Sequence, residues 1–206
     1  MKKTIFFALL LLLPPVLRLS AGEPCPGLIS PVDDRAYTES VISLIGNARS
    51  AVNIIMYVAR RYQKYPDSPS NRILSALADA AQRNVSVTVI LDQSEESKNG
   101  EEEYGPDNSE VGLYLVKKGI SVYLDSAKKK THAKLIIIDG KYTVVGSTNW
   151  TYSALAKNNE TAVIIDSPSL ADHYLRYFEQ VKKESPGNLQ ITKSRRKSRT
   201  AVKTED

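Results

Sequence analysis

Cysteine and histidine are both scarce in this chain, which has one cysteine, Cys25, and two histidines, His132 and His173, among 206 residues. A single cysteine excludes a disulfide within the chain. One cysteine and two histidines also cannot supply the ligands of a zinc site at the usual spacing. We therefore expect neither a metal nor another cofactor, and any chemistry that needs an imidazole must use one of two residues.

Long hydrophobic runs are also missing, apart from Ile5 to Leu13 near the N-terminus. This run is too short to span a bilayer, which takes about 20 residues. Two lysines precede it, and two prolines and the small residues Ser20-Ala21-Gly22 follow. That order is typical of an export signal, so we predict a signal peptide over residues 1–22, a periplasmic or secreted protein, and no stable membrane span after cleavage. An uncleaved membrane anchor is the alternative, because Val16 to Leu19 could lengthen the run.

The formal net charge of +5 is concentrated at the two ends of the chain. Three basic residues lie in the N-terminal segment, and the tail from Lys182 onward is strongly basic, which leaves an acidic region between them. The run Lys193 to Arg199 has no apolar periodicity, so we predict that residues 185–206 form a disordered tail. This tail could bind a polyanion or anionic headgroups, or could have no partner.

Between these ends, the hydrophobic pattern alternates between helical and strand periods. Helical spacing predicts four helices: after Asp33-Asp34, after Ser70, over 107–118, and from Pro168 to about Lys183. Apolar alternation predicts six strands: 51–57, 85–91, 120–124, 131–138, 143–145 and 161–165. We expect Asp33 or Asp34 to cap the first helix and Ser70 to cap the second. The pattern predicts a single α/β domain over 23–184, a layered domain with a mixed β-sheet packed between helices and no internal repeat.

The most informative segment runs from Thr131 to Asn149 and reads His-x-Lys-x4-Asp-x6-Gly-Ser-x-Asn. In a strand, His132 and Lys134 project from one face, roughly 6 to 7 Å apart, while Leu135 and Ile137 point the other way into a core. A titratable nitrogen and a fixed positive charge at that distance could both contact one phosphate.

This pattern resembles the HKD signature of the phospholipase D superfamily at each of its defining positions. Asn158-Asn159-Glu160, before a strand, also resembles the segment that follows the motif in the small bacterial endonucleases of that superfamily. The resemblance covers roughly Asp33 to Val181. It implies the phospholipase D/nuclease fold and the hydrolysis of phosphodiester bonds without a metal.

The resemblance also implies roles for the motif residues. His132 would be the nucleophile in one subunit and the general acid in its mate, and Lys134 and Asn149 would clamp the phosphate. Ser147 would assist through its hydroxyl. Glu160 would accept a hydrogen bond from the second imidazole nitrogen and so fix its tautomer.

Three further residues complete the candidate site. Asp139 ends the motif strand before a glycine turn, and we interpret it as a structural partner rather than a reacting group. Gly146 would permit close approach of the backbone to the phosphate. Lys130, in the triplet Lys128-Lys129-Lys130, would contact a phosphate backbone, although the triplet could also be a solvated turn.

The chain contains this motif only once, whereas the family chemistry uses two histidines from two copies. His173 has no lysine two residues later and is expected on a helix surface. We therefore predict a homodimer with the active site on its two-fold axis, so that each protomer provides one imidazole.

The substrate is less constrained by the sequence. The single-motif format favours an endonuclease that acts on DNA or RNA; a phospholipase D that hydrolyses phosphatidylcholine is the alternative, and an inactive binding module a remote one. The acidic segment 92–110 is expected to be a mobile loop that could repel a polyanion, or simply be solvated. Three aromatic residues near the motif could border a cleft or pack in the core: Tyr142, Trp150 and Tyr152.

Overall fold

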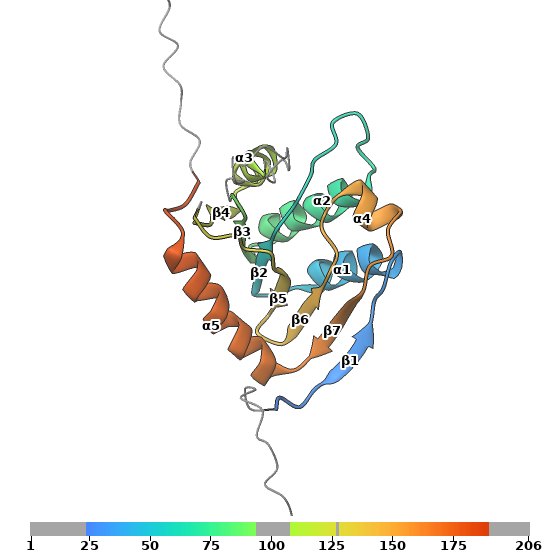
Figure 1. Ribbon diagram of the computed structural model, residues 1–206, viewed down its shortest axis with the longest axis vertical. Coiled ribbons are helices and arrows are strands. Elements are labelled where there is room, and N and C mark those ends of the chain that lie inside the picture. Colours follow the sequence, from blue (N-terminus) through green and yellow to red (C-terminus); the bar gives the residue numbers. More distant parts are fainter. Residues whose placement is uncertain (1–23, 94–107, 127, 190–206) are drawn as a thin grey trace, which may run out of the picture.

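A seven-stranded mixed sheet forms the centre of the computed structural model, which describes residues 24–93, 108–126 and 128–189 (Figure 1). The predicted signal peptide, most of the acidic loop and the tail beyond residue 189 lie outside these ranges. The strands are β1 (Leu28–Pro31), β2 (Ala51–Met56), β3 (Ser86–Leu91), β4 (Ser121–Leu124), β5 (Lys134–Ile138), β6 (Tyr142–Gly146) and β7 (Ala162–Asp166). The helices are α1 (Ala36–Asn47), α2 (Pro69–Gln82), α3 (Ser109–Lys117), α4 (Tyr152–Ala156) and α5 (Pro168–Glu184).

The strand order is β1-β7-β6-β5-β2-β3-β4. Strands β2, β3 and β4 are parallel to their neighbours in that group, and every other pairing is antiparallel. All six predicted strands and all four predicted helices are present. The predicted elements do not include β1 or α4. Both are short, with four and five residues, and β1 is exposed along its whole length.

The sheet is covered on both faces, with α1 and α2 on one side and α5 on the other (Figure 1). Along β5, Ile136 packs into the core on the α1–α2 side, whereas Leu135 and Ile137 pack toward α5. The predicted direction of Leu135 and Ile137 is therefore confirmed, and so is the layered α/β architecture. Leu189 also contacts the larger core, and its backbone N–H donates to Val122 O at 2.7 Å, so chain packing continues past the predicted domain end at residue 184.

Both predicted helix caps are wrong. Helix α1 begins at Ala36 without a side-chain cap, and the carboxylates of Asp33 and Asp34 instead accept hydrogen bonds from the backbone N–H groups of Ala162 and Glu160. Ser68 caps α2, because Pro69 occupies the first helical position, where its missing N–H leaves no bond unmade. Ser70 lies two positions after Ser68, is buried, and donates to the backbone oxygens of Arg60 and Trp150.

Four chain segments meet at one edge of the sheet. The register pairs Met56 at the end of β2 with Lys134 at the start of β5, and Leu135 with Val145 near the end of β6. Strand β3 is parallel to β2 and ends beside it at Leu91. The residues directly after β2, β3 and β6 and the segment before β5 therefore converge, and this segment carries His132.

Candidate active site

His132 and Lys134 lie in direct contact at this edge. Strand β5 begins only at Lys134, so His132 precedes it and the predicted strand was too long at its start. Lys134 Nζ lies 3.2 Å from His132 Nδ1 and 3.4 Å from Nε2, and it donates to His132 O at 2.8 Å. The expected separation of 6 to 7 Å was wrong, because the lysine side chain folds back over the ring instead of projecting parallel to it.

Tyr57, directly after β2, forms one wall of the site. Its ring centroid is 4.3 Å from that of His132, with an angle of 53° between the ring planes. Lys134 Nζ lies 4.7 Å and Lys130 Nζ 5.9 Å from the same centroid. No motif in the sequence identified Tyr57 as a site residue, although its place directly after a buried strand could have indicated it.

The local charges favour a neutral imidazole and an ionised lysine. Burial lowers the pKa of His132, and the positive charges of Lys134 and Lys130 lower it further, against an opposing effect of Asp92. Burial also lowers the pKa of Lys134, while Glu160 and Asp92 act to raise it. The ring is thus held in the form that a nucleophile needs at neutral pH.

A buried pair of carboxyl groups supports the segment that carries His132. Asp92 and Asp125 directly follow β3 and β4, and both are almost fully buried. Asp92 Oδ1 accepts a hydrogen bond from Thr131 N at 2.6 Å, and Asp125 Oδ1 accepts one from Gln93 N at 2.9 Å. Burial raises the pKa of Asp125, and Asp92 adds to that effect. No motif in the sequence indicated this pair, since the two residues are far apart in the chain.

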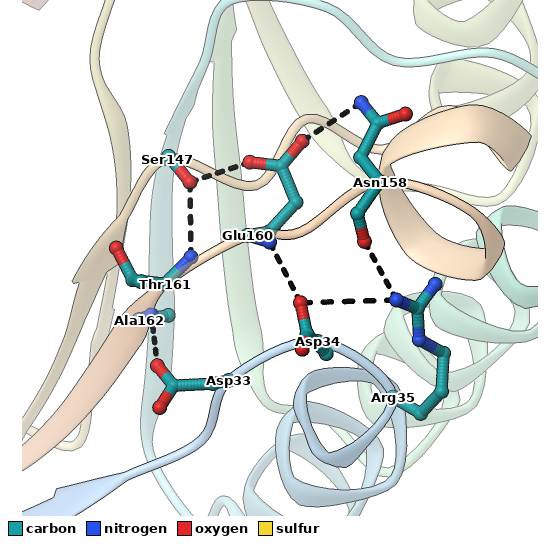
Figure 2. A network of polar contacts seen from close by, with 8 residues as sticks. All are labelled: Asp33, Asp34, Arg35, Ser147, Asn158, Glu160, Thr161 and Ala162. Carbon is teal, nitrogen blue, oxygen red and sulfur yellow. Dashed lines mark hydrogen bonds and ion pairs between the residues drawn. The ribbon is translucent and has the colours of Figure 1, made fainter.

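Glu160 lies at the centre of a second polar network (Figure 2). Its carboxylate accepts hydrogen bonds from Ser147 Oγ and, at 3.1 Å, from Asn158 Nδ2. Ser147 Oγ in turn accepts from Thr161 N at 3.1 Å. The backbone N–H of Glu160 donates to Asp34 Oδ1 at 2.7 Å. Within one protomer Glu160 thus holds Ser147 and Asn158, and the expected bond to the second nitrogen of the imidazole is not formed.

Asn149 is positioned by the residue that follows it. Trp150 is fully buried, its backbone N–H donates to Val58 O at 2.9 Å, and its indole donates to Tyr37 Oη at 3.2 Å. Of the two readings of Trp150, core packing is therefore correct. The side chain of Asn149 is half-buried, and its Oδ1 has no hydrogen-bond partner among the described residues. A buried amide oxygen without a partner marks a place that a ligand or solvent can occupy.

Asp139 has the structural role that the sequence suggested. It adopts a φ of 54°, and its carboxylate accepts hydrogen bonds from the backbone N–H groups of Arg49, Ser50 and Ala51 and from Ser50 Oγ. These bonds tie the end of β5 to the start of β2. Asp139 lies at the opposite end of β5 from Lys134 and so does not touch the site.

Gly146 lies where β6 and β7 pair at the end of β6. A Cβ atom at this position would lie 2.3 Å from Thr161 O and 2.6 Å from Ala162 Cα. The residue must be glycine because β6 and β7 approach closely there. The packing of the two strands thus gives a reason for glycine here, and the approach to a phosphate stays a prediction.

The lysine triplet and the second histidine are all exposed. Lys130 is exposed near His132, whereas Lys129 forms an ion pair with Glu184 of α5 at 3.1 Å. His173 is exposed on α5 against the ring of Tyr174, as expected for a helix-surface residue. One protomer therefore brings a single imidazole to the site.

Two possible features are missing from the part of the chain that the structure describes. No cluster of three or more histidine, cysteine, aspartate or glutamate side chains there could hold a metal ion. None of the helices in those ranges has the length and apolar character needed to cross a bilayer.

The comparison with known families assigns this arrangement. Residues 41–182 match the family model described as "Cardiolipin synthase, PLD-like domain". The chain belongs to the phospholipase D superfamily. Mitochondrial cardiolipin hydrolase of Xenopus laevis is 28% identical over 170 residues, which cover 82% of this chain and 70% of that protein. Phospholipase D of Rickettsia bellii is 35% identical over 104 residues, half of this chain and 47% of that protein. The prediction of a phosphodiesterase of this superfamily is thereby confirmed.

Solved structures agree on the fold. The phospholipase D family member Nuc from Salmonella typhimurium has a TM-score of 0.64 at 23% identity, over 80% of this chain and 99% of that chain. NucT from Helicobacter pylori has a TM-score of 0.54 at 20% identity, over 78% of this chain and 98% of that chain. At these identities the likeness confirms the predicted phospholipase D/nuclease fold and carries no conclusion about substrate.

Proposed function

We propose that this protein hydrolyses phosphodiester bonds through a phosphohistidine on His132, without a metal, and that its substrate is nucleic acid. The observation that carries the proposal is the ammonium group of Lys134 held against the ring of His132. The neutral imidazole attacks phosphorus, and the bond from phosphorus to the leaving oxygen breaks. Lys134 and the amide of Asn149 stabilise the negative charge on the other phosphate oxygens.

A second imidazole must give the leaving oxygen its proton. His173 is on the surface of α5, so we propose that the partner's His132 serves, in a homodimer with the active site on its two-fold axis. In the second step the same imidazole takes a proton from water, the water oxygen bonds to phosphorus, and the phosphorus–nitrogen bond breaks. Both subunits are then restored.

Nucleic acid is favoured over lipid by the additional cation at the site. Lys130 stands exposed beside the ring of Tyr57, beyond the lysine that contacts His132. A polyanionic backbone presents several phosphates to such a pair of charges, whereas a phospholipid has one diester. The names of the relatives favour the alternative, a phospholipase D that acts on phosphatidylcholine or a related phospholipid. We also propose that residues 1–22 direct export to the periplasm or the medium.

The test is to incubate the purified protein in excess chelator with single-stranded DNA, duplex DNA, RNA, and vesicles of phosphatidylcholine or cardiolipin. His132→Ala is the matched control. We expect cleavage of at least one nucleic acid, with a loss on the order of 10²–10⁴-fold or more in the variant. Release of the lipid headgroup with intact DNA and RNA would reverse the choice of substrate. Activity that required added magnesium would overturn the mechanism.

The dimer needs its own experiment. Light scattering should give a dimer at assay concentrations, and dilution to monomer should remove activity. Mixed dimers of wild-type and His132→Ala subunits should be nearly inactive. A monomer with full activity would contradict the shared site.

A further inference from the structure

A cavity of about 630 Å³ lies beside the candidate active site, between the loop after β2 and the start of α4. Three tyrosines, two prolines and three polar residues line it: Tyr62, Lys64, Tyr65, Pro66, Asp67, Ser68, Pro69 and Tyr152. Residues 57–68, which form one wall, rise above α2 and α4 in Figure 1. None of these residues has a part in the chemistry proposed above.

Two chain segments connect this tyrosine pocket to the reacting groups. The segment that begins with Tyr57 at the His132 ring reaches Tyr62 at the pocket, and the segment that begins with Asn149 reaches Tyr152. The segments are joined side by side, since Trp150 N donates to Val58 O and Arg60 N donates to Trp150 O, both at 2.9 Å. Three residues of fully extended chain span about 10 Å, so Tyr152 at the pocket lies no more than about that far from Asn149.

The pocket is held open by contacts of its own walls. Tyr152 N donates to Tyr62 Oη at 2.9 Å, and the two rings meet edge to face at 6.5 Å. The side chain of Asn71 on α2 accepts from Tyr62 N and donates to the backbone oxygens of Tyr62 and Tyr65, at 2.8 to 3.0 Å. Pro66 and Pro69 restrict the loop further. Such a site binds without first ordering its loop.

The exposed surfaces and charges indicate the ligand. Tyr65 is 69% exposed and Tyr152 is 45% exposed, so both tyrosines are accessible to solvent. Lys64 lines the cavity, and Lys157 Nζ lies 5.5 Å from the ring of Tyr152. The carboxylate of Asp67 acts on Arg72 of α2, which offsets its charge. Open aromatic rings flanked by lysines are the elements that bind an unpaired base and its phosphate.

We propose that the tyrosine pocket binds a nucleobase of the substrate, stacked on Tyr65 and Tyr152, next to the phosphate that His132 attacks. The inference rests on the proposed function and narrows it to single-stranded nucleic acid, because a base in a duplex is already stacked and cannot enter the pocket. The contact is to an aromatic face, so it tolerates any base.

The experiment compares Tyr65→Ala and Tyr152→Ala with wild type on three labelled oligonucleotides: a single strand, the same strand with abasic residues, and a duplex. Tyr177→Ala, an exposed tyrosine on α5, is the matched control, and Tyr65→Phe keeps the ring. We expect KM for the single strand to rise about 5- to 100-fold in each alanine variant, with kcat unchanged. The abasic strand and the duplex should show no such rise, and Tyr177→Ala and Tyr65→Phe should match wild type.

Binding provides a measurement that does not depend on cleavage. Fluorescence anisotropy with the single strand and the abasic strand is measured in the His132→Ala background, with and without the tyrosine changes. If the tyrosines give a preference for the strand that has bases, the pocket is supported. This holds even if the wild type cleaves only lipid, because that result refutes only the assignment as a nuclease. Equal affinity for the two strands, or equal losses on both in the alanine variants, would overturn the inference.

Discussion

Lys134 Nζ lies 3.2 Å from His132 Nδ1 and donates to the backbone oxygen of the same residue. Two cations would repel strongly at this distance, and an ammonium can donate only to a ring nitrogen that lacks a proton. The pair is therefore stable as an ionised lysine with a neutral imidazole. Activity should fall at low pH as the attacking His132 becomes protonated. At high pH it should fall first as the partner's His132, the general acid, loses its proton, and then as Lys134 loses its own.

The acid limb of that profile should depend on Lys130. Its positive charge lowers the pKa of His132, so Lys130→Gln should raise that pKa. A nucleophile that must be neutral is lost as the pH falls through its pKa, and the acid limb of kcat/KM should therefore move to higher pH. Lys128→Gln changes a neighbouring exposed lysine that does not act on His132, and it should leave the limb in place. A limb that moved to lower pH in Lys130→Gln would contradict this electrostatic role.

The part of the alkaline limb that Lys134 sets should depend on Glu160. Its carboxylate acts to raise the pKa of Lys134, against the effect of burial, so Glu160→Gln should lower that pKa. An ammonium that must be charged is lost as the pH rises through its pKa, and the limb should therefore move to lower pH. The amide oxygen of glutamine can still accept from Ser147 Oγ, and its NH2 group can donate to the Asn158 oxygen once that amide turns over, which keeps the network of Figure 2. Glu179→Gln, on the exposed face of α5, is the control, and an unchanged limb in Glu160→Gln would count against the assignment.

Asp139 should affect stability without affecting the chemistry. Burial alone would raise the pKa of its carboxyl, but hydrogen bonds from Ala51, Ser50 and Arg49 outweigh burial and lower it. Asp139→Asn should reduce the free energy of unfolding at pH 7 by about 1–3 kcal/mol, measured by urea denaturation, with kcat of the folded protein unchanged. The lowered pKa means that this stability is present at neutral pH and lost as the pH falls through the folded-state pKa. A large loss of kcat with normal stability would instead place Asp139 in the chemistry.

Local patterns were sufficient for the parts of the fold that depend on neighbouring residues. Periodicity identified the buried strands and the longer helices, and the turn at Asp139-Gly140 was evident from its residues. The motif also assigned His132 and Lys134 to one site, although their contact arises because the lysine folds back over a ring that precedes the strand. Local patterns failed for the cap of α1, because Asp33 and Asp34 accept hydrogen bonds from Ala162 in β7 and from Glu160 just before it, more than 120 residues later.

The rest of the site depends on contacts that no local pattern encodes. Tyr57 reaches His132 only because β2 pairs with β5 in a register that sets Met56 opposite Lys134. The spacing of the motif also could not show that β6 and β7 approach closely at Gly146, where a Cβ atom would lie 2.3 Å from Thr161 O.

The buried pair of Asp92 and Asp125 leads to a last prediction. Burial raises the pKa of Asp125, and the nearby carboxyl of Asp92 raises it further. A raised folded-state pKa means that the wild type loses stability as the pH rises through that value. In Asp125→Asn the amide oxygen can still accept from Gln93 N, which lies 2.9 Å from Oδ1, but no charge forms. The variant should therefore gain stability relative to wild type between pH 4 and pH 7, with about 2–4 °C of Tm for each kcal/mol.

Asp172→Asn on the surface of α5 is the control, because it removes an exposed carboxylate. If Asp125→Asn were less stable than wild type at pH 7 and equal to it at pH 4, the carboxylate would be stabilising in the folded protein and the sign argued here would be wrong.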